Sequence, residues 1–234
     1  MKINILLCDT FPGLLPDFIP SYVSMFEKLF LSVNSSFKFK VYNSFNNEFP
    51  KRICRNELYL ITGSNNGVYE DIEWIKSLLE WIRNANARNG KIIGICFGHQ
   101  AVAQALGGKV EKAECGWGFG ERTSHIEGEG VAHFFPTNKI RLLYNHHDQV
   151  TQKPESARII AYSDFCKYDI LAYGSNIISF QGHPEYTVEY SKHLLEKHSN
   201  GEEASVRIKA KETLEHSDPQ GITALRLALD WLKL

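Results

Sequence analysis

The sequence predicts an α/β fold in which a mostly parallel central sheet carries helices on both faces. Two observations lead to this prediction. Strand-like apolar runs alternate with helix-like amphipathic runs over the first 106 residues, which is the order that parallel strands with crossover helices require. The chain of 234 residues is also long enough for one such domain with a substantial core and a small appendage.

The first elements follow from local patterns. Residues 3–8 form a continuous apolar run typical of a buried strand, and residues 37–42 alternate apolar and polar side chains as a half-buried strand does. Residues 22–33 carry apolar side chains at helical spacing, and residues 71–89 form an amphipathic helix that stops at Gly90. Two further strands and a helix are predicted at 58–62, 91–95 and 99–106.

The pattern changes after residue 109. Short strand-like segments separated by Gly, Pro and Asn are predicted at 109–111, 122–126, 140–144, 158–162, 170–173 and 176–181. Helical patterns are predicted at 188–198, 202–215 and 222–234. We expect residues 1–200 to form the main domain, and residues 201–234 to form a C-terminal helical extension that packs on the same domain.

Composition and charge exclude several classes of function. The formal net charge is −1 and no basic block is present, so nucleic acid is not an expected partner. No apolar run approaches the length of a membrane span, and no signal peptide pattern is present, so no membrane association is expected. The five cysteines are odd in number, scattered and without a Cys-x-x-Cys pair, which predicts free thiols in a cytoplasmic protein and no zinc site.

Residues 94–100 read Gly-Ile-Cys-Phe-Gly-His-Gln and join a strand to a helix. A glycine stands two positions before Cys96 and another two positions after it, which is the pattern of a sharp turn that exposes a nucleophile. Gly94 and Gly98 are needed because a Cβ at either position would clash. The start of the helix favours the thiolate of Cys96, and its first amides, including that of Phe97, are candidates to hold an oxyanion.

A second stretch reads Gln-Gly-His-Pro-Glu and ends the strand predicted at 176–181. His183 and Glu185 are two positions apart, so in an extended segment their side chains project to the same side. Pro184 fixes its own φ and favours extended geometry for His183. The imidazole is therefore a candidate general base, and the carboxylate is a candidate group to orient it.

These two stretches, in this order and about ninety residues apart, resemble the class I (triad-type) glutamine amidotransferase family. The resemblance runs from residue 3 to about residue 190 and implies a flavodoxin-like fold with a catalytic triad of Cys96, His183 and Glu185. It also implies hydrolysis of the γ-amide of glutamine through a glutamyl thioester. Segment 180–186 and the C-terminal tail are similar, in addition, to the stand-alone γ-glutamyl peptidases found in plants.

The resemblance implies further site residues. In the family, the turn after the strand at 58–62 supplies a second oxyanion amide, which maps onto Gly63 and Ser64. The family more often has proline near Asn65, which leaves open which amide of the turn points inward.

The residues that the resemblance places beside the substrate are Gln100, Trp117, His146, His147 and Asp148. Trp117 lies in a glycine-rich aromatic loop at 116–120, and packing in the core explains this residue equally well. No metal site is expected, because adjacent histidines diverge and no third ligand stands at a suitable spacing.

Three functions stay open at this point. The first is amidotransferase-type hydrolysis of a γ-glutamyl amide with ammonia passed to a synthetase partner, since the chain has neither a Gly-x-x-x-x-Gly-Lys-Ser/Thr loop nor a second domain large enough to activate an acceptor. The second is a stand-alone γ-glutamyl peptidase or hydrolase without an acceptor. The third is a non-catalytic relative that binds a partner. The expected substrate is a small molecule, glutamine or a γ-glutamyl compound, and no cofactor is expected.

Overall fold

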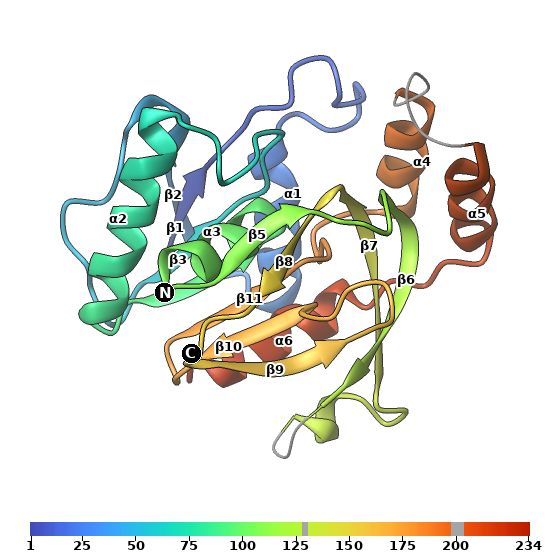
Figure 1. Cartoon of the computed structure of the whole chain (residues 1–234). Helices are drawn as coiled ribbons and strands as arrows, with labels where there is room; N and C mark the ends of the chain where they lie inside the picture. The colour runs from blue at the N-terminus through green and yellow to red at the C-terminus, as the bar shows by residue number, and fades with distance from the viewer. Residues whose placement is uncertain (128–130, 198–203) are drawn as a thin grey trace.

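The computed structural model describes residues 1–127, 131–197 and 204–234. A nine-stranded sheet with the order β2-β1-β3-β4-β11-β10-β9-β6-β7 forms its centre (Figure 1). Its strands are β1 (Lys2–Leu7), β2 (Lys38–Asn43), β3 (Leu58–Ile61), β4 (Lys91–Ile95), β6 (Gly118–Ile126), β7 (Lys139–His146), β9 (Ala157–Tyr162), β10 (Ile170–Tyr173) and β11 (Ile177–Phe180). A separate antiparallel pair joins β5 (Lys109–Lys112) to β8 (Asp148–Gln152).

The sheet has a parallel half and an antiparallel half. Strands β2, β1, β3, β4 and β11 run parallel, and β10, β9, β6 and β7 continue the sheet as antiparallel strands. The prediction of a mostly parallel sheet is therefore confirmed for five of its nine strands. Because the carboxyl ends of β3, β4 and β11 are neighbours, the residues that follow these three strands meet at one edge of the sheet.

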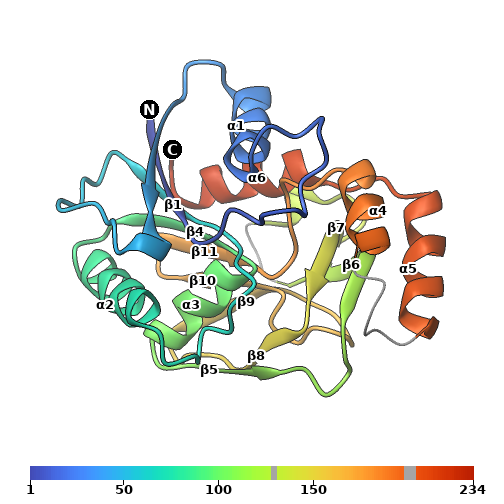
Figure 2. The same cartoon turned by 90° about the horizontal axis from the view of Figure 1, so that it is seen from above.

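Helices cover both faces of the parallel half, as the alternating pattern predicted. Helices α1 (Tyr22–Val33) and α6 (Gly221–Trp231) lie on one face, and α2 (Glu73–Ala87) and α3 (Phe97–Ala105) lie on the other (Figure 2). Each pair belongs to its own buried apolar cluster, with the sheet between the two clusters. No helix in the described ranges is long and apolar enough to cross a membrane.

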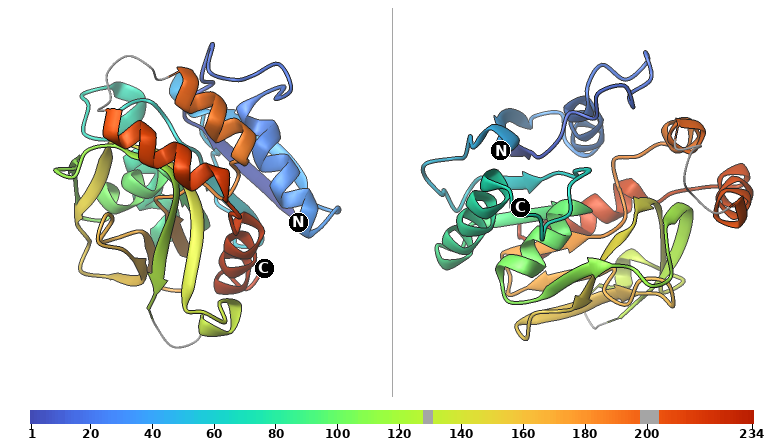
Figure 3. Two further views of the ribbon diagram at one scale, coloured as in Figure 1. Left: turned by 90° about the vertical axis from the view of Figure 1, so that its right-hand side faces the viewer. Right: turned by 45° about the horizontal axis from the view of Figure 1, so that its top comes forward.

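Two more helices lie beside the antiparallel half. Helices α4 (Val188–Lys197) and α5 (Ala204–Glu215) lie side by side and contact β6 and β7 (Figures 1 and 3). Residues 198, 202 and 203, which the sequence assigned to helix ends, and the expected domain boundary after residue 200 lie outside the described residues.

The structure corrects two sequence-based expectations. Strand β8 was not predicted, because its five residues carry no clear apolar alternation, and its pairing with β5 is what makes it a strand. Residues 118–120, expected in a glycine-rich loop, belong to β6. This position in β6 requires glycine, because a Cβ on Gly118 would lie 2.6 Å from Nε2 of His146 and clash with it.

The C-terminal helix α6 begins against the segment that follows β11. A Cβ on Gly221 would lie 2.1 Å from the carbonyl oxygen of Pro184, so this helix start touches the backbone between His183 and Glu185. The backbone amide of Gln220 donates to the carbonyl oxygen of Arg141, and the backbone amide of Arg141 donates to Oε1 of Gln220. These two bonds hold the start of the helix beside β7. Ala224, Leu225 and Ala228 of α6 are buried in the same apolar cluster as α1.

Candidate active site

Cys96 stands on the sharp turn between β4 and α3. A Cβ on Gly94 would lie 2.6 Å from the carbonyl oxygen of Gly98, and a Cβ on Gly98 would lie 2.3 Å from that of Ile61, so both glycines are required as predicted. The backbone of Cys96 has φ 52° and ψ −106°, a strained conformation for a residue with a side chain. Its amide donates to the carbonyl oxygen of Phe180, 2.8 Å away, which holds the turn on β11.

The imidazole of His183 lies next to Cys96 and bonds to Glu185. The distance from Nδ1 of His183 to Oε1 of Glu185 is 2.7 Å, so the predicted side-by-side placement of imidazole and carboxylate is confirmed. Burial by itself would lower the pKa of His183, but the negative charges of Glu185 and Cys96 outweigh burial and raise this pKa to about 10. The arrangement therefore favours the imidazolium form of His183 at neutral pH.

Two tyrosines that the sequence analysis did not single out support this pair. The hydroxyl of Tyr22 donates to Oε1 of Glu185 at 2.9 Å, across 163 positions of sequence. The ring of Tyr186 stacks on that of His183, with centroids 3.8 Å apart and planes 13° apart. Both tyrosines are buried, so they restrict the imidazole and the carboxylate to one arrangement.

The turn after β3 lies beside Cys96 and His183. A Cβ built on Gly63 would lie 3.4 Å from Cε1 of His183 and 3.8 Å from Cβ of Cys96. Within the described residues the amides of Gly63 and Ser64 donate no hydrogen bond to the protein, whereas the amide of Asn65 donates to Oδ2 of Asp9 at 3.0 Å. Of these three amides, only that of Asn65 is already engaged.

Comparison with known proteins agrees with this geometry. Residues 14–199 match the family model of Glutamine amidotransferase class-I. The chain belongs to this family.

Two relatives and one solved structure show the range of similar proteins. The chain is 31% identical to γ-glutamyl peptidase 5 of Arabidopsis thaliana over 195 residues, which cover 80% of this chain and 78% of the relative. It is 31% identical over 127 residues to a glutamine-hydrolysing GMP synthase subunit of Methanocaldococcus jannaschii, covering 53% of this chain and 65% of that protein. A glutamine amidotransferase structure from Thermotoga maritima is 18% identical, covers 100% of this chain and 98% of its own, and superposes with a TM-score of 0.76.

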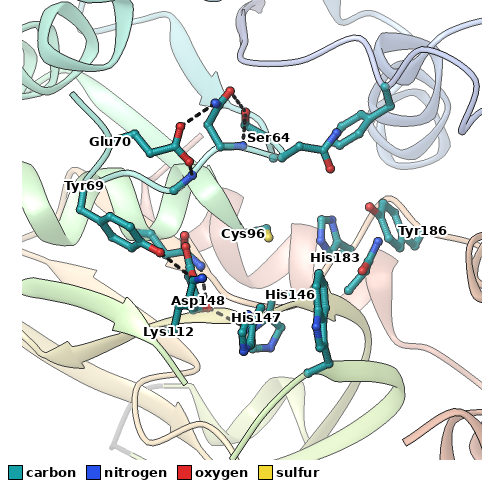
Figure 4. A pocket seen from close by; sticks show the side chains of 18 residues that line it. Ser64, Tyr69, Glu70, Cys96, Lys112, His146, His147, Asp148, His183 and Tyr186 are labelled. Atoms are coloured by element: carbon teal, nitrogen blue, oxygen red, sulfur yellow. Dashed lines mark hydrogen bonds between the residues drawn. The ribbon is translucent and has the colours of Figure 1, made fainter. Parts of the chain in front are cut away.

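The amidotransferase site opens into a cavity of about 290 Å³ (Figure 4). The predicted site residues that line it are Gly63, Ser64, Cys96, Gln100, Trp117, His146, His147, Asp148 and His183. Glu185 lies behind His183 and does not line the cavity. The side chain of Phe97 also lies outside it, buried with its ring 5.5 Å from that of Trp74, so any contribution of Phe97 comes from its backbone amide.

The predicted substrate-side residues have distinct environments. The side-chain amide of Gln100 donates to the carbonyl oxygen of Asp148 at 2.8 Å and to Oε1 of Gln181 at 3.1 Å, so it ties α3 to β8 and to the residue that follows β11. Burial lowers the pKa of His146 to about 3, which keeps its ring neutral. The ring of His147 instead stacks on Trp117, with centroids 5.2 Å apart, so the two histidines do diverge.

The far wall of the cavity contains three polar residues that the sequence analysis missed, Tyr69, Glu70 and Lys112. Lys112 of β5 is the register partner of Asp148 of β8, so both side chains project from neighbouring positions on the same face. The hydroxyl of Tyr69 donates to Oδ1 of Asp148 at 3.2 Å. Glu70 accepts from the amide of Gly67 at 2.7 Å and shapes the turn after β3. A prediction of strand β8 would have indicated Lys112, and nothing local in the sequence indicates Tyr69 or Glu70.

Proposed function

We propose that this chain hydrolyses the amide bond of a γ-glutamyl group, in glutamine or a γ-glutamyl compound, through a thioester on Cys96. The observation that carries the proposal is one chain of contacts. Cys96 stands on a strained turn beside His183, and the other ring nitrogen of His183 is bonded to Glu185. Nucleophile, base and orienting group are thus in reach of one another at the edge of a cavity.

The reaction follows from these positions. The thiolate of Cys96 attacks the γ-carbonyl carbon and forms the C–S bond, while the free amides of Gly63 and Ser64 and the amide of Phe97 stabilise the oxyanion. His183 donates its proton to the departing nitrogen as the C–N bond breaks. Water then attacks the thioester and gives a proton to His183. The C–S bond breaks, the thiolate returns, and glutamate leaves after losing its carboxyl proton to solvent.

The two sides of the cavity suit the two ends of the substrate. In Figure 4, His183 and Tyr186 lie on one side of Cys96, and Asp148 and Lys112 lie on the other. The leaving nitrogen must face His183, so the α-ammonium and α-carboxylate of the glutamyl group extend toward Asp148 and Lys112. The neighbouring opposite charges of Asp148 and Lys112 complement the α-ammonium and the α-carboxylate of the glutamyl group.

The fate of the amine separates the two candidate activities. Identity of 31% to a γ-glutamyl peptidase across most of both chains favours a stand-alone hydrolase that releases glutamate and an amine. The similarity to a GMP synthase subunit favours the alternative, in which ammonia passes to a synthetase partner. The cytoplasmic location stays a proposal, supported by five unpaired cysteines.

The test is glutamate release by the purified chain, from glutamine and from a γ-glutamyl dipeptide in parallel, with Cys96→Ala as the control. We expect release from the dipeptide that is lost in Cys96→Ala. Release from neither substrate, with Cys96 still labelled by the glutamine analogue 6-diazo-5-oxo-L-norleucine, would indicate an amidotransferase that needs its synthetase. Undiminished turnover by Cys96→Ala, or no labelling of Cys96, would refute the proposed function.

A further inference from the structure

The helix that carries Tyr22 begins at this residue for a local reason. Ser21 caps α1 through its side chain, which accepts from the amide of Ser24, and the side chain of Ser24 accepts from the amide of Ser21 in return. Tyr22 is therefore the first residue of the helix, and its direction is set by a rigid start. The rings of Phe11 and Phe26 pack edge-on against it, with centroids 4.7 Å and 5.1 Å away.

The hydroxyl of Tyr22 reaches the oxygen that orients the base. It donates to Oε1 of Glu185 at 2.9 Å, and Nδ1 of His183 lies 2.7 Å from the same oxygen. The hydroxyl also lies 2.9 Å from the position that a Cβ on Gly63 would occupy, so it sits between the carboxylate and the turn after β3. One hydroxyl thereby touches two parts of the site.

Glu185 needs such a restraint. In the described part of the chain, Oε2 of this carboxylate has no hydrogen-bond partner, although only 4% of the residue is exposed. Glu185 also borders a second cavity of about 560 Å³, on the other side from the substrate, with Met25, Leu29 and Ile222. A carboxylate held by the imidazole alone would be bonded to the protein through one contact only.

We propose that Tyr22 is a positioning residue for the reaction, which fixes Glu185 and through it the imidazole of His183. This inference rests on the proposed function. Because burial, followed by the charge of Glu185, raises the pKa of Tyr22 well above its usual range, the hydroxyl stays protonated and remains a donor. Among the described residues, His183, Tyr186 and Tyr190 interact electrostatically with this carboxylate, and Cys96 interacts with His183 and Tyr22. Lys28 and Glu189 border the second cavity with Glu185.

The test compares Tyr22→Phe with Tyr59→Phe. Tyr59 is an equally buried tyrosine whose hydroxyl, among the described residues, bonds only to backbone atoms, those of Cys54 and Arg52. For Tyr22→Phe we expect kcat to fall about tenfold, the effect of losing one hydrogen bond to a charged group, with KM unchanged. We also expect the acid limb of the pH–rate profile to move to higher pH, because a less well-placed carboxylate stabilises the imidazolium less, and the imidazolium is the cation beside the thiolate. Tyr59→Phe should change neither kcat nor the position of the acid limb.

A second readout needs no substrate. The rate at which iodoacetamide alkylates the peptide containing Cys96, followed by mass spectrometry against pH, reports the thiolate directly. Its midpoint should move to higher pH in Tyr22→Phe and stay in place in Tyr59→Phe. Unchanged kcat and an unchanged alkylation midpoint in Tyr22→Phe would overturn the inference while the wild-type turnover keeps the proposed function intact.

If Tyr22→Phe fails to fold, replacement of Tyr22 by 3-fluorotyrosine serves instead. The more acidic phenol donates a stronger hydrogen bond to Oε1 of Glu185, the oxygen that also holds His183, so the alkylation midpoint should shift from that of the wild type. No movement would again overturn the inference. Loss of Cys96 reactivity in the wild-type protein itself would contradict the proposed function, a result that the two variants cannot mimic.

Discussion

Asp169, a buried carboxyl group at the start of β10, makes folding depend on pH in an unusual direction. It accepts hydrogen bonds from Tyr144, at 2.6 Å, and from Ser124, and its residue is 1% exposed. Burial raises its pKa from 3.8 to about 6, in spite of both hydrogen bonds. A shift of about two pKa units at about 1.4 kcal/mol each corresponds to about 3 kcal/mol of folding free energy.

The sign follows from the direction of this shift. A group whose pKa is higher in the folded protein stabilises the fold fully below its unfolded pKa, and this stabilisation is lost as the pH rises through about 6. Asp169→Asn keeps an acceptor for Tyr144 and does not ionise. We therefore expect the free energy of unfolding of Asp169→Asn, relative to the wild type, to increase by about 2.5 kcal/mol between about pH 4 and about pH 8.

Urea denaturation followed by circular dichroism at several pH values measures this difference. Asp164→Asn, which changes an exposed aspartate nearby, is the matched control and should give a nearly constant difference from the wild type. A difference between Asp169→Asn and the wild type that stays constant across this pH range would refute the reasoning.

Three more perturbations test the site and its support. Gly98→Ala places a Cβ 2.3 Å from the carbonyl oxygen of Ile61, so labelling of Cys96 by 6-diazo-5-oxo-L-norleucine should slow by at least about tenfold; an unchanged rate contradicts the role of this turn. Lys112→Gln should raise KM for the γ-glutamyl substrate about tenfold and leave kcat intact, and a fall in kcat alone would argue against binding of the α-carboxylate. Ser21→Ala removes the cap of α1 and should lower the free energy of unfolding by about 1 kcal/mol in urea titrations, with no loss if the cap is unimportant.

The part of the site that the sequence predicted depends on short-range geometry. Around Cys96, two glycines two positions away on either side are sterically required, so spacing alone indicated the turn. His183 and Glu185 face each other because they stand two positions apart next to a proline. The parallel half of the sheet was predictable for the same reason, since continuous apolar runs indicate strands buried on both faces.

The parts that escaped prediction depend on long-range contacts. Tyr22 meets Glu185 across 163 positions, and from the sequence it is one more apolar residue on a helix. Lys112 joins the cavity only because β5 pairs with β8, a strand without an alternating pattern. Both contacts are set by the tertiary arrangement, which overrides local propensity.

The contact between Gly221 and Pro184 has a consequence for how the protein matures. The start of α6 lies against the carbonyl oxygen of Pro184, and the helix fills the apolar space beside α1. While the chain is being synthesised, Cys96 and His183 leave the ribosome well before residue 221 does. We therefore expect the segment that carries His183 and Glu185 to gain its full support only when α6 has docked.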